Sequence, residues 1–124
     1  MMDETFSRNL YLEHLEEASL LYEYRMSLSD YSEESDQDKE DTEERFEAHI
    51  DALVIGSDIA IDVCRQQISE GEYEALYPSI CLFCRQHRMD LIQEVQGLMN
   101  ALNKQDLIDI IYAAMKREKY YPKI

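Results

Sequence analysis

The sequence predicts an all-α fold. Only three Gly and two Pro occur in 124 residues, so few positions interrupt helices. Apolar residues recur at helical spacing along most of the chain, whereas alternating runs of β-branched residues are scarce. The length suits one domain, and we expect a single helical domain over residues 1–124 with about six helices.

The first helix is predicted from Asn9 to Met26, with Leu15, Ala18 and Tyr22 on one apolar stripe. The next segment, residues 30–44, holds nine acidic residues and one basic residue. A segment so like-charged and so poor in apolar residues does not fold alone. We therefore expect residues 29–40 to form a mobile acidic connection.

Two helices are expected next, over residues 42–54 and 57–69. Gly56 occupies the position of a left-handed cap between them, and Ser57 is expected to cap the second of the two. Pro78 interrupts the following helical pattern, residues 72–88, so that this helix either begins near Pro78 or bends there. Asp90 and Asn103 are expected to cap the last two helices.

Short helices joined by turns of a few residues pack as antiparallel neighbours. Residues 46–68 and 77–102 also repeat weakly at a spacing of about 40 residues, within the range of HEAT-type helix pairs. The sequence therefore predicts short antiparallel helix pairs stacked as a HEAT-like mini-solenoid, or else a compact bundle.

Acidic residues dominate the charge of the chain. The formal net charge is −15, and residues 1–62 hold 19 acidic and 4 basic residues, whereas residues 63–124 hold 8 of each. Such a surface repels phosphate backbones and anionic lipid headgroups. We expect no direct binding of nucleic acid or membrane.

The amino-terminal residues lack the basic start and apolar run of a secretory signal, and an odd number of cysteines, three, does not suggest a disulfide framework. We therefore expect a cytoplasmic protein.

Cys81, Cys84 and His87 form a C-x-x-C-x-x-H pattern. Thiolates and imidazoles bind zinc, but apolar Leu82 and Phe83 continue a helix where a zinc knuckle would need a turn. We interpret the cysteines as core residues and expect no metal and no cofactor. No nucleophile, acid–base or phosphate-binding motif is present either, so we do not expect an enzyme.

Two stretches carry a family resemblance. These are H-L-E-E-A at residues 14–18, continuing to Arg25, and E-R-F-E-A-H-I-D-A-L at residues 44–53, continuing to Gly56. With the turn at residues 71–72, they resemble the amino-terminal region of a proteobacterial HEAT-like family of unassigned function, often encoded beside type VI secretion genes. The resemblance covers about residues 10–100 and implies an α-helical binding protein in the setting of interbacterial toxin delivery.

Charge and resemblance together favour a non-catalytic module that neutralises a basic effector, as an immunity protein against a nuclease-type toxin of a type VI secretion system. An adaptor or chaperone that loads an effector onto the secretion apparatus is the alternative. It would use an open apolar edge at Ile108, Ile111 and Met115, which could also dock a second copy of the chain.

The predicted partner-binding residues are acids and tyrosines of the first half of the chain: Asp30, Glu33, Glu34, Asp36, Asp38, Asp58, Asp62, Tyr24 and Tyr31. Glu17, Arg45 and His49 lie beside the predicted packing stripes of the first two helices. We therefore expect Glu17 and Arg45 to form an ion pair that fastens the first helix.

Overall fold

The computed structural model describes residues 4–28 and 33–120, with side chains from residue 36 onward in the second range. It contains five α-helices: α1 (Glu4–Ser27), α2 (Glu33–Ser69), α3 (Leu76–Arg85), α4 (Met89–Ala101) and α5 (Gln105–Arg117). A short 3-10 helix, η1 (Tyr73–Ala75), precedes α3. The described residues contain no strand, so the predicted all-α class is confirmed, with five α-helices where about six were expected.

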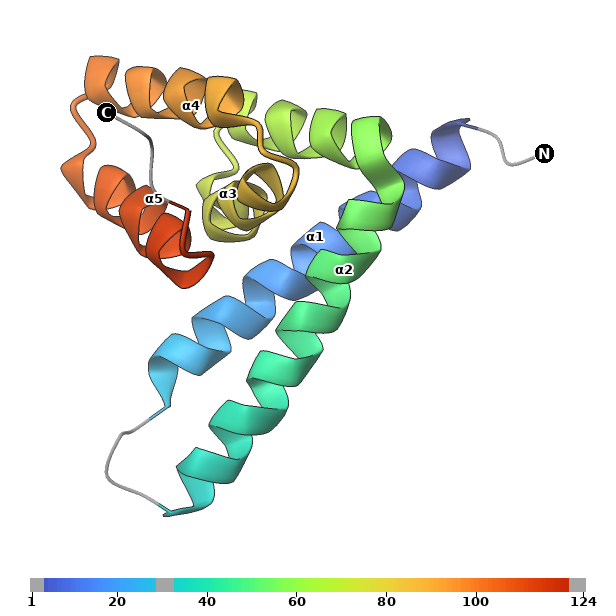
Figure 1. Cartoon of the computed structure of the whole chain (residues 1–124), viewed down its shortest axis with the longest axis vertical. Helices are drawn as coiled ribbons and strands as arrows, with labels where there is room; N and C mark the ends of the chain where they lie inside the picture. The colour runs from blue at the N-terminus through green and yellow to red at the C-terminus, as the bar shows by residue number, and fades with distance from the viewer. Residues whose placement is uncertain (1–3, 29–32, 121–124) are drawn as a thin grey trace.

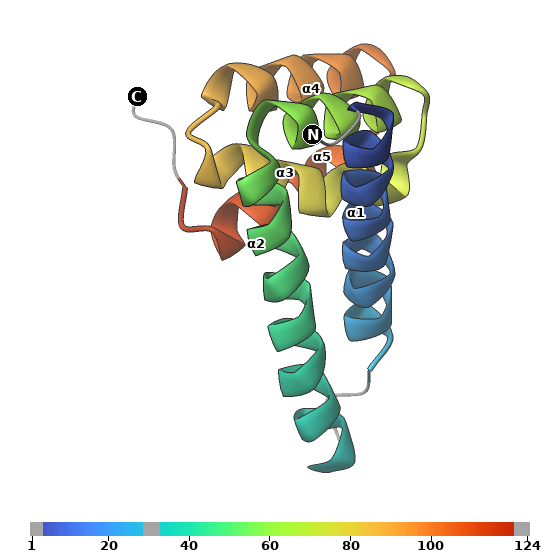
Figure 2. The same cartoon turned by 90° about the vertical axis from the view of Figure 1, so that its right-hand side faces the viewer.

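A long helical hairpin projects from a more compact group of helices (Figures 1 and 2). The hairpin consists of α1 and the part of α2 that precedes Ser57. The remainder of α2 turns away and lies with α3, α4 and α5 at the other end of the molecule. The arrangement is a compact bundle with one extended arm.

The first turns of α2 overlap the predicted acidic connection. We expected a mobile segment up to residue 40, but α2 begins at Glu33. Acidic residues favour the amino-terminal turns of a helix, where their charge complements the helix dipole. Asp36 also pairs with Lys39 one turn later, with 3.9 Å between carboxylate and ammonium. The prediction was therefore wrong for residues 33–40, which are helical.

α2 bends at Ser57, which has φ 51° and ψ −126°. We expected Gly56 to take the left-handed conformation, but the positive φ falls on the next residue. Gly56 serves a different purpose, because a Cβ atom there would lie 2.6 Å from Cε1 of Tyr11. The missing side chain allows α1 to approach α2 closely at the bend.

α3 is the central helix of the bundle. Every residue from Leu76 to Cys84 is buried, and α3 contacts the other four helices. Pro78 lies in its first turn, where a backbone N–H has no partner within the helix, so of the two predicted alternatives the helix begins near the proline.

Four helices end in a residue with left-handed backbone conformation: Gly71, His87, Asn103 and Lys119. In each case the following backbone N–H bonds to a carbonyl five residues earlier, as in the Schellman motif; one example is Lys104 N–H to Met99 O at 3.0 Å. Asn103 therefore ends α4. We had expected it to cap α5, and that prediction was wrong. Asp90 does not cap α4 either, since it lies inside the first turn and pairs with Arg88 at 2.9 Å.

Candidate functional site

The acidic excess of the protein coincides with the hairpin. Residues 1–56, which end at the bend, hold 17 acidic and 4 basic residues, whereas residues 57–124 hold 10 acidic and 8 basic residues. The structure thus assigns most of the negative charge to the projecting arm, and leaves the compact group of helices almost neutral.

Three of the four basic residues of this arm are paired with acids of α2. The guanidinium of Arg8 lies 2.6 Å from the carboxylate of Asp62, and Arg25 lies 3.6 Å from Glu43. Lys39 pairs with Asp36, as described above. These cations therefore compensate acids of α2 and not those on the outer side of α1.

The outer face of α1 carries four exposed carboxylates at helical spacing: Glu13, Glu16, Glu17 and Glu23. Within the described residues, no basic side chain lies within 4 Å of any of them. Leu20, which is 59% exposed, and Tyr24, which is 48% exposed, lie on the same side of the helix. This surface, which we call the acidic face, combines unpaired negative charge with two large apolar groups.

A pocket of about 410 Å³ lies beside the acidic face, where α1 meets the turn before α3. Four carboxylates line it, from Glu16, Glu23, Glu72 and Glu74, together with Leu15, Ser19, Leu20, Gln67 and Ala75. A hydrogen bond with Glu74 and the repulsion between the two carboxylates raise the pKa of Glu72. The pocket therefore concentrates negative charge beside an apolar wall.

The predicted partner-binding acids do not lie on one surface. Asp36 and Asp38 lie in the first turns of α2, whereas Asp58 and Asp62 follow the bend. At 1.5 Å per residue, Asp38 and Asp58 are separated by about 30 Å along the helix. Asp62 is also paired with Arg8. Asp30 and Tyr31 lie outside the described residues, as do the side chains of Glu33 and Glu34.

The predicted ion pair between Glu17 and Arg45 is wrong. Both side chains are exposed, and among the described residues no ion pair joins them. Between α1 and α2 the structure instead brings His14 and His49 together, with 2.9 Å between their Nδ1 atoms. This contact could not be predicted from the sequence, because the two histidines are 35 residues apart and belong to no local motif.

The strongest ion-pair cluster joins the first part of α2 to α3 and α5. Arg85 contacts Glu47 at 2.7 Å and Glu118 at 2.7 Å, and Arg117 contacts Glu47 at 2.6 Å. Burial alone would raise the pKa of Glu47, but hydrogen bonds from Arg117 and Arg85 outweigh it and lower that pKa. This cluster fastens the arm to the bundle.

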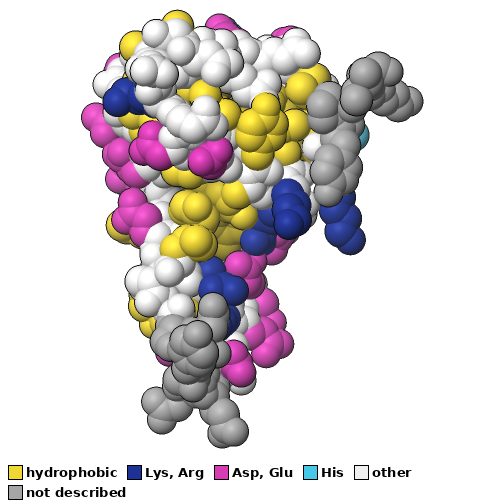
Figure 3. Space-filling view, turned by 90° about the vertical axis from the view of Figure 1, so that its left-hand side faces the viewer, with side chains coloured by type: hydrophobic (Ala, Val, Ile, Leu, Met, Phe, Trp, Pro, Cys, Tyr) yellow, Lys and Arg dark blue, Asp and Glu magenta, His cyan; other side chains and the backbone are white. Residues whose placement is uncertain are grey.

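The face of the molecule that Figure 3 shows carries a hydrophobic patch bordered by basic and acidic side chains. A small pocket of about 200 Å³ lies between α1, α2, α3 and α5 and is lined by Leu21, Tyr22, Arg25, Met26, Thr42, Glu43, Phe46, Tyr77 and Arg117. The rings of Tyr22 and Tyr77 stack in it, with centroids 3.9 Å apart. Its two arginines are already paired with Glu43, so we interpret it as packing between arm and bundle.

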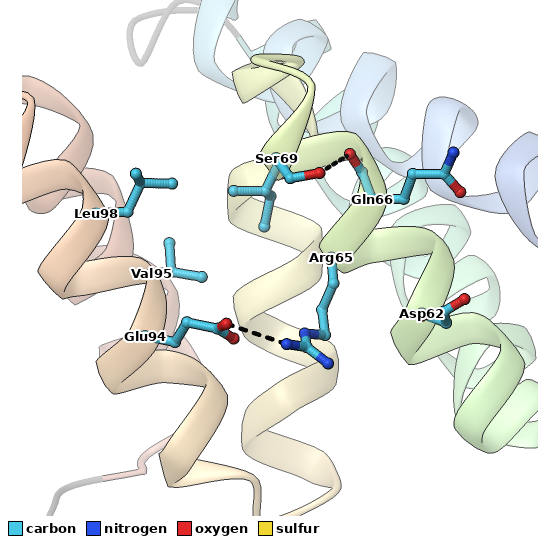
Figure 4. A pocket seen from close by; sticks show the side chains of 8 residues that line it. Asp62, Arg65, Gln66, Ser69, Glu94, Val95 and Leu98 are labelled. Carbon is cyan, nitrogen blue, oxygen red and sulfur yellow. Dashed lines mark hydrogen bonds and ion pairs between the residues drawn. The ribbon is translucent and has the colours of Figure 1, made fainter.

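A third pocket, of about 480 Å³, separates the end of α2 from α4 (Figure 4). Ile68, Val95 and Leu98 give it an apolar lining, and Arg65 pairs with Glu94 across it at 3.0 Å. Its other charged residue, Asp62, is compensated by Arg8, so the pocket offers no preference for a ligand of either sign.

The three cysteines are buried and free, which confirms their interpretation as core residues. Burial raises the pKa of Cys64 to about 12 and that of Cys84 to about 12. These thiols are therefore protonated at neutral pH, whereas metal binding or nucleophilic attack requires the thiolate. Among the side chains of residues 4–28 and 36–120, no group of three or more His, Cys, Asp or Glu residues is arranged to hold a metal ion.

No helix in the described part of the chain has both the length and the apolar character needed to span a membrane. Comparison with known proteins found no match among protein-family models, curated proteins or solved structures. We therefore infer the mode of binding from the surface itself.

Proposed function

We propose that this protein is a non-catalytic binding module that neutralises a basic effector protein through the acidic face of its hairpin. The observation that supports this proposal is the separation of charges within the arm. Three of its four cations, Arg8, Arg25 and Lys39, are paired with acids of α2, whereas the carboxylates on the outer side of α1 are exposed and unpaired. A cationic partner would meet these carboxylates without displacing an existing ion pair.

Electrostatics gives this surface two properties that an inhibitor needs. A field of one sign accelerates the encounter with a partner of opposite charge, and it rejects anionic macromolecules. Proteins that grip phosphate groups must present Lys and Arg, so a nuclease-type toxin is a partner of matching chemistry.

The pocket beside the acidic face suits a basic side chain of such a partner. The methylene stem of Lys or Arg can pack against Leu15 and Leu20, while its charged end meets the carboxylates of Glu16 and Glu23. Tyr24, exposed near the end of α1, supplies the kind of aromatic group that anchors protein interfaces. The acids with which we expect direct contact are thus those of the acidic face of α1: Glu13, Glu16, Glu17 and Glu23.

The biological setting in this proposal, immunity against a toxin of a type VI secretion system, rests on the resemblance of residues 10–100 to a helical family encoded near such systems. The adaptor alternative relied on Ile108, Ile111 and Met115, which are buried in the core. The apolar edge that this alternative requires at these three residues is therefore not exposed.

The proposal is tested by capture of partners from the native cell with the full chain as bait. The test variant carries Glu13→Gln, Glu16→Gln and Glu23→Gln, which neutralise the acidic face. A matched control carries Glu94→Gln, Asp106→Asn and Asp109→Asn, which remove the same charge from exposed positions of the second half. We expect the wild-type protein and the control to capture the same basic protein and the test variant to lose it.

Two further measurements make the test specific. The association rate with the captured protein should fall steeply from low to physiological ionic strength. The captured protein should also lose its own activity when the bait is added. An acidic or neutral partner, or equal capture by both variants, would contradict the proposal, and a rate independent of salt would favour apolar docking.

A further inference from the structure

Two imidazoles face each other inside the hairpin. His14 on α1 and His49 on α2 are both half-buried, and their Nδ1 atoms are 2.9 Å apart. The ring centroids are 5.2 Å apart and the ring planes are tilted by 51°. In the neutral pair one Nδ1–H donates to the lone pair of the other Nδ1, so two good metal-ligand atoms share one proton.

We propose that His14 and His49 together bind a divalent transition-metal ion of the Cu²⁺ or Ni²⁺ type, which links α1 to α2. The convergence of two imidazole nitrogens from different helices carries this assignment, since imidazole is a preferred ligand of these ions. Two neighbouring ligands of a square-planar ion, each about 2.0 Å from the metal, are separated by about 2.8–2.9 Å, whereas two ligands of tetrahedral Zn²⁺ are about 3.3 Å apart. Once the rings have turned, both nitrogens can therefore ligate a square-planar ion with little change in the 2.9 Å that separates them.

Binding requires each imidazole to turn by about 45°, so that both Nδ1 lone pairs point to one ion. The rings meet nearly head-on, so both must tilt toward an ion beside the line between the nitrogens. The imidazole that donates must move its proton from Nδ1 to Nε2, which frees both Nδ1 lone pairs and releases no proton. Both groups must be neutral, and burial, followed by the neighbouring His14 and Arg45, lowers the pKa of His49 and so favours its neutral form.

Charges around the pair favour a cation on balance. Glu17 follows His14 by one turn on α1 and its negative charge acts on His49, whereas Arg45 on α2 acts in the opposite sense. The arm as a whole is strongly negative and attracts cations. Because only two side chains contribute ligands, water completes the coordination, and the ion remains exchangeable.

The test uses the full chain titrated with CuSO₄ at pH 7.5, followed by calorimetry, thermal unfolding and electron paramagnetic resonance. We expect one ion per chain, a rise in the unfolding temperature, and a resonance spectrum with hyperfine splitting from two nitrogen ligands. Ni²⁺ should bind more weakly in the same ratio, and Mg²⁺ and Ca²⁺ should leave the unfolding temperature unchanged.

Three variants separate this site from unspecific binding. H14Q and H49Q should each lose the one-to-one event, whereas H87N, which removes the third histidine of the chain at the end of α3, should retain it. Circular dichroism checks that each variant is folded. If H14Q or H49Q still bound one Cu²⁺ ion, the proposal would be overturned.

Measurements on the wild-type protein keep the proposal testable even if a variant does not fold. A spectrum with one nitrogen ligand or none would overturn it, and so would an equal stabilisation by Mg²⁺ and Ca²⁺, because that would indicate a general response of the acidic arm to cations.

Discussion

Arg117 lies over the ring of Phe46, with its guanidinium carbon 4.6 Å from the ring centroid. The same guanidinium contacts the carboxylate of Glu43 at 2.5 Å and that of Glu47 at 2.6 Å. One side chain at the end of α5 thus holds the first part of α2 by a cation–π contact and two ion pairs. This contact fixes the acidic arm relative to the bundle.

Arg117→Ala should therefore destabilise the protein by about 1–3 kcal/mol, because it removes the cation–π contact and leaves two half-buried carboxylates with fewer partners. Urea unfolding followed by circular dichroism measures the loss. Arg65→Ala is the matched control, since it removes an ion pair with Glu94 in which both side chains are exposed. It should cost no more than about 0.5 kcal/mol. Equal losses would show that the Arg117 cluster does not hold the arm.

Gly56→Ala should destabilise the protein by about 1–3 kcal/mol, because the new methyl group would lie 2.6 Å from the ring of Tyr11 and 2.9 Å from Cβ of Ala60. Gly97→Ala provides the control. Gly97 lies within α4, and a Cβ atom there has no neighbour within 4 Å. That change should stabilise the protein by about 0.8 kcal/mol through helix propensity. Similar effects of both substitutions in urea unfolding would contradict the close approach of α1 to α2.

Much of the helical core was predictable from the sequence, because its signal is local. The stripe of Leu15 and Ala18 on α1 is buried, as is that of Ile108, Ile111 and Met115 on α5. Spacing along one helix is enough to predict which of its faces packs inward.

Helix boundaries were less predictable, since several residue types compete for the same positions. Asn103 suits both an amino-terminal cap and a left-handed helix end, and the structure uses it for the second. The acidic run looked unable to fold alone, yet it forms the start of a helix that packs against α1.

The candidate site was predictable only as a charge imbalance. Which acids remain unpaired depends on partners far along the chain, as when Arg8 compensates Asp62 across 54 residues. The contact between His14 and His49 likewise exists only once the hairpin has formed. No spacing rule connects such residues.

The cysteines should not react with a thiol reagent in the native protein. All three are buried. Burial raises the pKa of Cys64 and that of Cys84 to about 12, so both thiols stay protonated and unreactive at pH 8. A colorimetric disulfide reagent should therefore modify them only after urea is added, when all three react. Ser69→Cys, at an exposed position near the end of α2, should add one thiol that reacts at once. Rapid modification of the wild-type protein would show that the core opens readily.

Acidification should destabilise the hairpin through His49. Burial, and then the charges of His14 and Arg45, lower the pKa of His49 below its ordinary value of 6.5, while Glu17 partly opposes them. His49 therefore binds a proton more readily in the unfolded chain than in the folded chain. The free energy of unfolding falls as the pH drops below about 6.5.

Urea unfolding midpoints between pH 7.5 and pH 5 measure this loss of stability. The range stays above the ordinary pKa of Glu47, 4.5, which its arginine partners lower further, so that group remains ionised throughout. His49→Gln should flatten the dependence on pH, because the side chain no longer titrates, whereas His87→Asn, a change at an exposed turn, should keep the wild-type slope. If His49→Gln left the slope unchanged, the loss would arise elsewhere in the acidic arm, and the paired imidazoles would not control the stability of the hairpin.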